Sequence, residues 1–531
     1  MQSDSGSTVS IWMATAEVPT QSAALAEDTR ADVCVVGAGI AGMTTAYLLA
    51  REGKSVVVLD DGPVGAGMTE RTTAHLSNAI DDRYYEIERL HGEKGARLTA
   101  SSHTAAIDRI ETIVNEEGID CDFERLDGFL FTGAHRSKKE LDDELKAAHR
   151  AGLTGVERVR RAPIDAFDTG AALRFPRQGQ FHPLKYLAGL ARAIRRTGGR
   201  IYTETHASKI EGGSPLAHIE TSNGARVSAG AVVVATNTPV NDLFAIHTKQ
   251  APYLTYVIGA RVPKGSVTKA LYWDTLDPYH YVRIQSVRAE DEAGGAGEDG
   301  EGHDVLIVGG EDHKTGQKHD TERRYARLEK WARKRFPMMK EIEYRWSGQV
   351  METIDGVAFI GRNPLDAPNV YIATGDSGMG MTHGTIAGIL LTDLIAGREN
   401  EWATVYDPSR ITLRAAGEFI KENLNVAAQF ADYATPGDVD SVEGLAPGEG
   451  AIIRHGLEKV AAYRDEDGVV HTYSAVCRHL GCIVSWNANE KTWDCPCHGS
   501  RYDTDGRVFN GPANTDLPPV DTSEVESHQG S

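Results

Sequence analysis

Residues 32–42 read Asp-Val-Cys-Val-Val-Gly-Ala-Gly-Ile-Ala-Gly, and this stretch determines the fold expected for most of the chain. A short apolar strand runs into glycines with the spacing Gly-x-Gly-x-x-Gly, and good helix formers follow as far as Arg51. A second apolar strand, residues 55–59, ends at Asp60. A strand, a glycine turn, a helix and a strand ending in an acid together predict a dinucleotide-binding βαβ unit.

Each glycine of the motif has a separate physical task. Gly37 permits the tight turn, Gly39 lets the backbone approach a pyrophosphate, and Gly42 lets the helix pack closely on the strand. The amides at the helix N-terminus face the phosphates, and Asp60 can accept hydrogen bonds from a ribose. A glycine-rich turn without function is the alternative, and the flanking elements disfavour it.

A second glycine-rich segment, residues 375–380, favours FAD over NAD. It follows a buried strand at residues 370–374 and precedes a helix at residues 385–396. Its amides and the dipole of that helix can therefore face a flavin ring or a phosphate. The position of the first motif near the N-terminus agrees with this interpretation.

With these segments the chain resembles the D-amino acid oxidase and glycine oxidase superfamily of FAD enzymes. The resemblance implies an α/β FAD-binding domain, Rossmann-like and of the glutathione-reductase type, with an antiparallel β-sheet substrate domain covering the isoalloxazine ring. Such enzymes oxidise a C–N bond of an amine or amino acid. The stretches that carry the resemblance are residues 33–60, 65–76, 181–183, 231–239, 356–361 and 375–384.

The resemblance also implies a set of FAD contacts. Thr72 occupies the position of the flavin-linked histidine of some relatives, and no cysteine lies near Gly356, so we expect non-covalent FAD, although His75 is close by. The expected FAD-binding residues are Gly37, Gly39, Ile40, Ala41, Gly42, Asp60, Asp61, Thr72, Thr73, Ala74, Ala235, Gly375, Gly378, Met379 and Gly380.

The substrate residues are expected on the antiparallel sheet, about residues 245–325. Strand alternation places Tyr279, Tyr281 and Arg283 on one face. Arg283 could hold a substrate carboxylate with two hydrogen bonds, and an arginine on the outer face of an edge strand is the alternative. His313, in a polar turn at residues 309–313, is either catalytic or a hydrogen-bonded turn histidine.

A second constellation lies near the C-terminus, in the segments 477–482 (Cys-Arg-His-Leu-Gly-Cys) and 495–500 (Cys-Pro-Cys-His-Gly-Ser). Two cysteines and two histidines with this spacing are the ligand set of a Rieske 2Fe–2S centre, and a structural zinc site is the alternative. Two further cysteines stand at equivalent positions, where they could bridge the two loops. The expected roles are cluster ligands for Cys477, His479, Cys495 and His498, a disulfide for Cys482 and Cys497, and hydrogen bonds to cluster sulfurs for Ser500 and Tyr502.

Residues 440–520 resemble Rieske domains, and the high-potential members of cytochrome bc complexes are the most similar. The segment Gly511-Pro512-Ala513 resembles the loop that covers the cluster in this family. The resemblance implies a small all-β domain with a potential of roughly −150 to +300 mV. If the imidazole edges of His479 and His498 are exposed, they are the natural exit for electrons.

We expect four segments along the chain. They are an FAD-dependent oxidoreductase at residues 28–405, a helical linker at 406–438, a Rieske domain at 439–521, and a disordered tail at 522–531. A Gly- and acid-rich stretch at residues 289–303 has almost nothing to bury and predicts a mobile loop.

Composition excludes some classes of function. The 531 residues carry a formal net charge of −20, which argues against binding to nucleic acid phosphates. The polar first 29 residues show no signal peptide, and the apolar stretch 385–397 is too short to span a bilayer. We therefore expect a cytoplasmic protein without a transmembrane segment. Cys34 and Cys121 are expected to be buried free thiols.

These features predict a dehydrogenase of a small amine or amino acid. Its FAD takes two electrons from the substrate, and its Rieske cluster passes them singly to an external acceptor, a quinone or a small redox protein. An NAD(P)H-linked flavin reductase is the first alternative, but residues 231–239 lack the glycine turn of a second dinucleotide site. A Rieske oxygenase would need a large iron-binding domain after the cluster. A non-catalytic redox sensor would be favoured by a helix that exposes residues 411–433 to a partner.

Overall fold

The glycine motif follows the central strand of an eight-stranded sheet in the computed structural model of the chain. The structure describes residues 5–16, 22–132, 138–241, 246–288, 302–456 and 458–521. Most of the stretch expected as a mobile loop (289–301) and the tail expected as disordered (522–531) lie outside these ranges. None of the helices in the described ranges is long and apolar enough to cross a membrane.

The first sheet is a largely parallel sheet that carries the nucleotide motif. Its strand order is β16 (Phe359–Arg362), β17 (Val370–Thr374), β10 (Arg226–Val234), β1 (Thr29–Val36), β2 (Val56–Leu59) and β7 (Arg200–Tyr202), and β9 (Ala217–Thr221) and β8 (Ala207–Glu211) extend it beside β10. Val33 and Val35 join one hydrophobic core, whereas Cys34 and Val36 join another on the opposite face. The alternation shows that β1 is buried on both sides, as in a central parallel strand.

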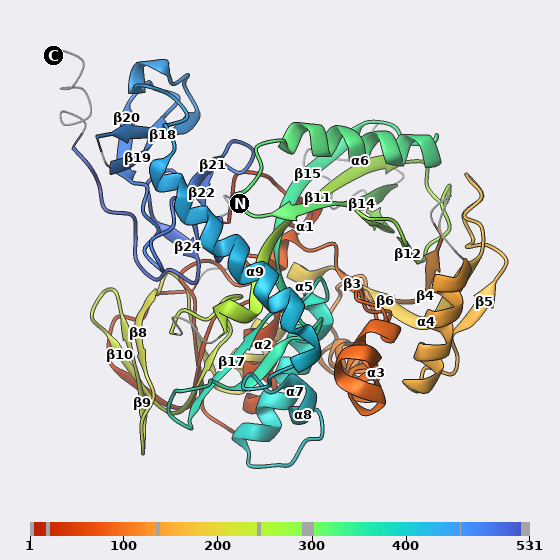
Figure 1. The fold of residues 1–531 in the computed structure, drawn as a ribbon. Coiled ribbons are helices and arrows are strands. Elements are labelled where there is room, and N and C mark those ends of the chain that lie inside the picture. Colours follow the sequence, from red (N-terminus) through yellow and green to blue (C-terminus); the bar gives the residue numbers. More distant parts are fainter. Residues whose placement is uncertain are drawn as a thin grey trace.

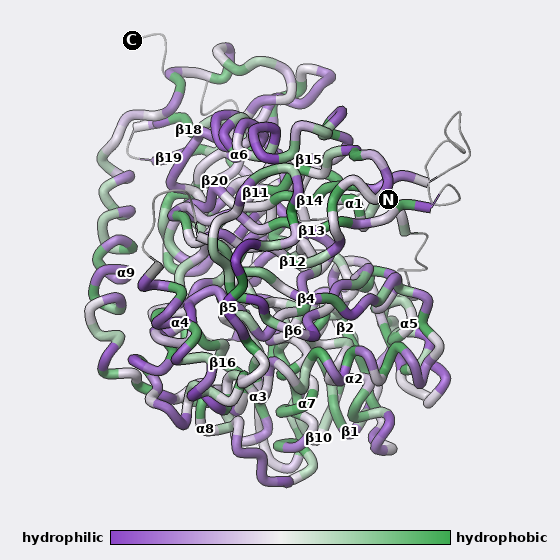
Figure 2. The backbone as a smooth tube through the Cα atoms, turned by 90° about the vertical axis from the view of Figure 1, so that its right-hand side faces the viewer, coloured by the Kyte–Doolittle hydropathy of each residue, from purple (hydrophilic) through white to green (hydrophobic). Residues whose placement is uncertain are grey.

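Helices cover the larger of these two cores. They are α2 (Ile40–Arg51), α5 (Pro183–Arg196), α7 (Gly380–Ile395), α3 (Tyr84–Glu117) and α4 (Lys138–Arg150). Figure 2 shows hydrophobic segments gathered along α2, α7 and β1. The N-termini of α2 and α7 are thus placed at the carboxyl ends of β1 and β17, where nucleotides bind in such sheets.

The second sheet has nine strands and is wider than the range 245–325 expected for it. Its order is β15 (Ile342–Thr353), β11 (Gln250–Val262), β14 (His303–Lys314), β13 (His280–Val287), β12 (Leu271–Asp274), β4 (Glu124–Phe131), β6 (Ala172–Gln180) and β3 (His75–Leu76), with β5 (Glu157–Val159) beside β6. It is not wholly antiparallel, because β12 and β4 run parallel. Helix α6 (Thr321–Arg335) lies across one face of this sheet (Figure 1).

The remaining chain forms a linker and a small all-β domain. Helix α9 (Ala416–Gln429) follows α8 (Ala403–Tyr406) and passes across the surface to the C-terminal strands (Figure 1). Its side chains Ile420 and Leu424 are 58% and 65% exposed. The C-terminal domain contains a three-stranded sheet, β18 (Glu449–His455), β19 (Glu458–Arg464) and β20 (Val470–Ser474), and a four-stranded sheet, β21 (Ser485–Asn487), β22 (Thr492–Asp494), β23 (Arg501–Tyr502) and β24 (Val508–Asn510).

Candidate active site and cluster site

The turn between β1 and α2 has a geometry that only glycine allows. Gly37 has φ of +106°, and a Cβ there would lie 2.4 Å from the carbonyl oxygen of Ala235. A Cβ on Gly42 would lie 1.9 Å from the carbonyl oxygen of Gly37. The amide of Ala38 donates to a carboxylate oxygen of Asp60 at 2.5 Å. The turn is therefore a close-packed cradle whose backbone can approach a pyrophosphate.

One large cavity opens from this cradle toward the second sheet. Gly42 is not among the described residues of its wall, because it packs helix against strand, and neither is Ala74. The expected FAD-binding residues in the wall are Gly37, Gly39, Ile40, Ala41, Asp60, Asp61, Thr72, Thr73, Ala235, Gly375, Gly378, Met379 and Gly380. Two motifs more than 300 residues apart in the sequence thus line one cavity, as a dinucleotide site built from both motifs requires.

Sequence reasoning missed much of the rest of the wall. Thr69 accepts a hydrogen bond from the amide of Ile40 at 3.1 Å, and no local motif indicates this. Residues 508–511, 513 and 514 belong to the C-terminal domain but also line the cavity. Other missed lining residues are Gly67, Met68, Arg71, Thr205, His206, Asn237 and Gln349.

The end of the cavity that faces the second sheet is aromatic. Tyr281 lines it, and its hydroxyl lies 2.8 Å from Oγ1 of Thr255. The ring of His75 lies 5.8 Å from that of Tyr281 and 6.0 Å from that of Trp273. Burial and the nearby charge of Arg283 lower the pKa of His75 to about 3, so this imidazole is neutral at physiological pH.

Arg283 shares the face of Tyr281, as alternation predicts, but its guanidinium is not available to a substrate. It is fully buried and donates hydrogen bonds to the carbonyl oxygens of Thr73, Ala74 and Phe181 at 3.0–3.3 Å. Its plane also lies over the ring of Trp12. Arg283 therefore holds the backbone of the cavity wall, and the expectation that it binds a carboxylate is corrected.

His313 lies on the opposite side of the sheet from the cavity. Its Nε2 is 2.9 Å from the hydroxyl of Tyr256. The ring of Tyr256 packs in turn against the ring of Tyr325 in α6. Its Nδ1 is 2.7 Å from the carbonyl oxygen of Lys314. His313 is therefore a hydrogen-bonded structural histidine, as the alternative proposed. The expectation that His313 is catalytic is corrected.

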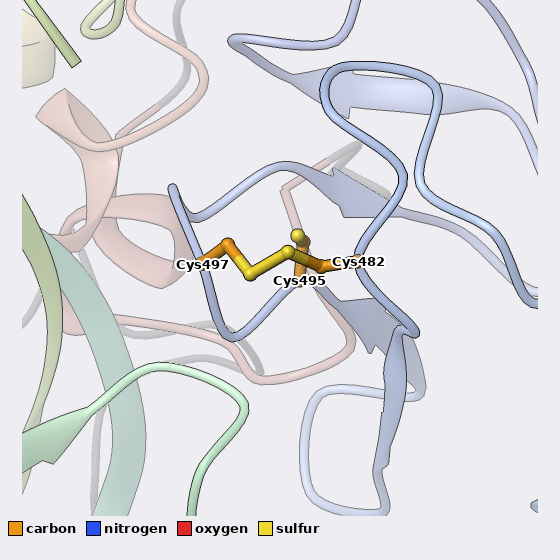
Figure 3. A group of neighbouring side chains, drawn as sticks. All are labelled: Cys482, Cys495 and Cys497. Carbon is orange, nitrogen blue, oxygen red and sulfur yellow. A yellow bond between two sulfur atoms is a disulfide. The ribbon is translucent and has the colours of Figure 1, made fainter. Parts of the chain in front are cut away.

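The expected cluster residues converge in the C-terminal domain. Cys477 and Cys495 are buried free cysteines, whereas Cys482 and Cys497 form the expected disulfide, with Cys495 beside it in Figure 3. The hydroxyl of Tyr502 lies 3.3 Å from the sulfur of Cys477 and donates to it. Hydrogen bonds from Cys495, Tyr502 and other donors lower the pKa of Cys477, which favours the thiolate that iron requires.

The histidine rings fit the same centre. The rings of His479 and His498 lie 4.9 Å apart, edge to face. Within the described residues, the buried Nδ1 of His498 has no hydrogen-bond partner, as expected for an atom that binds a metal. The ring of His247 lies 4.8 Å from that of His479 and 6.1 Å from that of His498. The imidazoles therefore face the oxidoreductase, and the expected exit through exposed imidazole edges is corrected for His498, which is 5% exposed.

A hydrogen-bonded bridge joins the cavity to the cluster site. Gln349 lines the cavity, and its Nε2 donates to the carbonyl oxygen of Gly499 at 2.9 Å. Asn510 donates to Oε1 of Gln349 at 2.7 Å and to the same carbonyl at 3.0 Å. Gly499 directly follows His498, so the hydrogen bond from Gln349 connects the cavity wall to the loop of an expected cluster ligand.

A buried ion pair connects the oxidoreductase domain to the C-terminal domain. Arg71, at the end of the short helix η1 (Thr69–Arg71), lies 3.1 Å from Glu490, and neither side chain is exposed. Glu490 also accepts hydrogen bonds from the hydroxyls of Thr8 and Ser347. Burial alone would raise the pKa of Glu490, but the charges of Arg71 and Arg501 outweigh it and lower that pKa.

Comparison with known proteins agrees with both halves of this description. A family of FAD-dependent oxidoreductases, DAO, matches residues 32–394, and the Rieske [2Fe-2S] domain family matches residues 436–521. The Bacillus subtilis Rieske 2Fe-2S iron-sulfur protein YhfW is 32% identical over 96% of this chain and 97% of its own length. The Escherichia coli gamma-glutamylputrescine oxidoreductase is 29% identical over 70% of this chain and 85% of its own length.

Solved structures agree on the fold of the larger part. Glycine oxidase from Geobacillus kaustophilus has a TM-score of 0.57 at 18% identity, and the match covers 72% of this chain and 99% of that one. The Rieske match indicates a 2Fe–2S cluster rather than zinc, and the assignment of its ligands to Cys477, His479, Cys495 and His498 stays a prediction. The cofactors are thus FAD and a Rieske cluster, and the family acts on C–N donors. The chain belongs to the DAO family of FAD-dependent oxidoreductases and carries a C-terminal Rieske 2Fe–2S domain.

Proposed function

We propose that this chain is a dehydrogenase of a small amine or amino acid that delivers electrons through its own cluster to an external acceptor, a quinone or a small redox protein. FAD supplies the two-electron oxidation of a C–N bond, and the cluster supplies one-electron transfer. The observation that carries the proposal is the bridge from Gln349 in the cavity wall to Gly499 beside the ligand His498. A flavin oxidase that used only oxygen would have no need of such a bridge.

The residues around the bridge support a fixed route between the two sites. Asn510 donates hydrogen bonds both to the side-chain oxygen of Gln349 and to the carbonyl oxygen of Gly499. Gly499 has φ of +83°, and a Cβ there would lie 2.6 Å from both Gln349 and Pro252. Only glycine fits this contact, so the cluster loop can approach the cavity wall this closely.

The position of residues 231–239 argues against the NAD(P)H-linked reductase. An NAD(P)H-linked reductase would need a second nucleotide site, for NAD(P)H, in addition to the FAD site. Ala235, Thr236 and Asn237 instead line the same cavity as the glycine motif of α2. They therefore contribute to one nucleotide site rather than forming another.

A redox sensor is the second candidate, and helix α9 favours it. Its exposed side chains Ile420 and Leu424 lie four residues apart, on one face that a partner could cover. The sensor and the dehydrogenase differ in turnover, because a sensor needs no substrate in the cavity. The cytoplasmic location expected from the sequence stays a prediction.

Anaerobic titration of the purified holoprotein with amines, amino acids and NADPH tests the proposal. We expect an amine or amino acid to bleach the flavin absorbance and then to produce the rhombic EPR signal of a reduced Rieske cluster. Flavin bleaching that leaves the cluster oxidised would overturn the proposed electron route. Bleaching by NADPH alone would establish the reductase, and no bleaching by any of these compounds would favour the sensor.

A further inference from the structure

The end of the cavity that faces the second sheet contains acids as well as aromatic rings. Asp81 and Asp376 line it together with Tyr279 and Tyr281. The hydroxyl of Tyr279 donates to Asp81 at 3.2 Å, and the rings of Tyr279 and Tyr281 lie 5.6 Å apart. Carboxylates and the faces of aromatic rings both attract ammonium ions.

Three further carboxylates lie behind these two, within electrostatic reach but not among the described residues that line the cavity, and we call the five the acidic end of the cavity. Glu352 lies within electrostatic reach of the other four, and burial together with their charges raises its pKa well above the usual value. Burial and the charge of Asp81 likewise raise the pKa of Asp82. In the described structure, Oδ1 of Asp312 is shielded from solvent and has no hydrogen-bond partner. The acidic end consists of Asp81, Asp82, Asp312, Glu352 and Asp376.

No basic side chain in the described ranges forms an ion pair with any of these five acids. Arg83 is close to Asp81, but its guanidinium donates to the backbone carbonyl oxygens of Ile80, Asp81 and Asp274. The charges of Arg83, near Asp81 and Asp82, and of Arg324, near Asp312, offset the raised pKa values of these acids only in part. The acids are therefore either protonated or matched by a cationic ligand.

The cavity also offers no counter-ion to a substrate carboxylate. Among the described residues that line it, Arg71 is the only lysine or arginine, and its guanidinium is paired with Glu490. His383 lines the same cavity at 3% exposure, and its buried Nε2 has no hydrogen-bond partner among the described residues. A free amino acid would bring its negative charge toward the acidic end.

We infer from this arrangement that the substrate is an aliphatic diamine or polyamine, with one ammonium group bound by the acidic end and its aromatic wall while another amine is oxidised. This inference rests on the proposed dehydrogenase function and selects among its substrates. A free α-amino acid is a poor substrate because its carboxylate meets Asp81 and Asp376 in the cavity wall and no available cation. A monoamine lacks the second charge and binds more weakly.

Three probes of similar length and different charge test the inference. They are 1,4-diaminobutane with two positive charges, 1-aminobutane with one, and 4-aminobutanoate with one positive and one negative charge. With the holoenzyme under anaerobic conditions, we expect kcat/KM for flavin reduction to fall in that order, by about tenfold or more at each step. Calorimetry on holoenzyme reduced beforehand with dithionite measures binding without turnover, and the same order is expected.

Two variants locate the effect and one controls for general charge. Asp81→Asn and Asp376→Asn, which change the two acids that line the cavity, should each reduce the preference for the diamine over 1-aminobutane by at least about fivefold. The exposed Glu399→Gln should leave the ratio unchanged. A preference for 4-aminobutanoate or an α-amino acid, or an unchanged ratio in both acid variants, would overturn the inference. If 4-aminobutanoate or an α-amino acid reduced the cluster, the diamine inference would fail while the proposed dehydrogenase function would stand. The failure of the inference and the failure of the proposed function are therefore distinguishable.

Discussion

Gln349 Nε2 and the carbonyl oxygen of Gly499 are joined by a 2.9 Å hydrogen bond that connects the wall of the cavity to the loop of the expected cluster ligand His498. Gln349→Leu keeps the size of the side chain but removes this bond and the one from Asn510. We predict that electron transfer from flavin to cluster slows by about tenfold, because about two hydrogen bonds that fix the loop are lost. Stopped-flow absorbance separates this step from flavin reduction, which should be unchanged.

Gln317→Leu is the matched control for this bridge. Gln317 also donates to a carbonyl of the cluster domain, that of Pro496 at 3.0 Å, but it is not among the described residues of the cavity wall. It should leave the inter-cofactor rate within about twofold of the parent. Equal slowing in both variants would show that the bridge has no special part in the route.

Glu490→Gln should destabilise the contact between the two domains. It leaves the buried guanidinium of Arg71 without its charge partner, a change that typically costs about 3–5 kcal/mol. Urea unfolding followed by cluster absorbance measures this loss. The exposed pair Arg97–Glu93 is the control, and Glu93→Gln there should cost less than about 1 kcal/mol. Equal costs for the two variants would contradict the fastening role of Glu490.

Tyr502→Phe should lower the midpoint potential of the cluster. The hydroxyl donates to the sulfur of Cys477 at 3.3 Å, and such a bond favours the more negative reduced cluster. Loss of one hydrogen bond of about 0.5–1.5 kcal/mol corresponds to a decrease of about 20–65 mV. A redox titration monitored by EPR measures the change, and Tyr473→Phe in the same domain should leave the potential unaltered. An unchanged or raised potential in Tyr502→Phe would count against this role.

The affinity for a diamine should rise with pH. Burial raises the pKa of Asp312 to about 7 and that of Asp376 to about 6, so both are largely protonated at pH 5 and ionised at pH 8. Only the ionised forms attract a cation, and KM for 1,4-diaminobutane should fall about tenfold between these pH values. Without a cation the sign is opposite for stability, because a raised native pKa makes stability fall as pH rises through it.

Thermal unfolding at the two pH values checks the expected increase in diamine affinity with pH. A saturating diamine should raise the Tm of dithionite-reduced holoenzyme more at pH 8 than at pH 5. The monoamine 1-aminobutane should give a smaller difference. An equal rise at both pH values would mean that ionisation of these acids does not control binding.

Sequence predicted the parts of the fold and site that depend on local patterns. The turn at Gly37 and the disulfide of Cys482 and Cys497 follow from spacing, because backbone geometry and paired loops constrain neighbours in the chain. The ligand roles of Cys477 and Cys495 stay a prediction. The substrate face did not follow in the same way. Alternation placed Tyr281 and Arg283 on one face, but only the fold shows that Arg283 is occupied by backbone carbonyl oxygens.

Relationships between distant segments were beyond sequence patterns. His247 covers the cluster imidazoles, and residues 508–514 reach the FAD cavity, yet neither segment carries a motif for these contacts. Likewise, β15 and β4 join the second sheet from outside the range expected for it. Tertiary packing determines such contacts, and a single sequence does not record which surfaces meet.

Single-turnover kinetics test the central claim, which is that electrons pass from FAD to the Rieske cluster within one chain. Anaerobic holoenzyme is mixed with one equivalent of substrate, and flavin absorbance and the cluster EPR signal are followed at several protein concentrations. We expect cluster reduction to follow flavin reduction with a rate that is independent of protein concentration. A rate that rises in proportion to protein concentration, or a cluster that stays oxidised while the flavin is bleached, would contradict it.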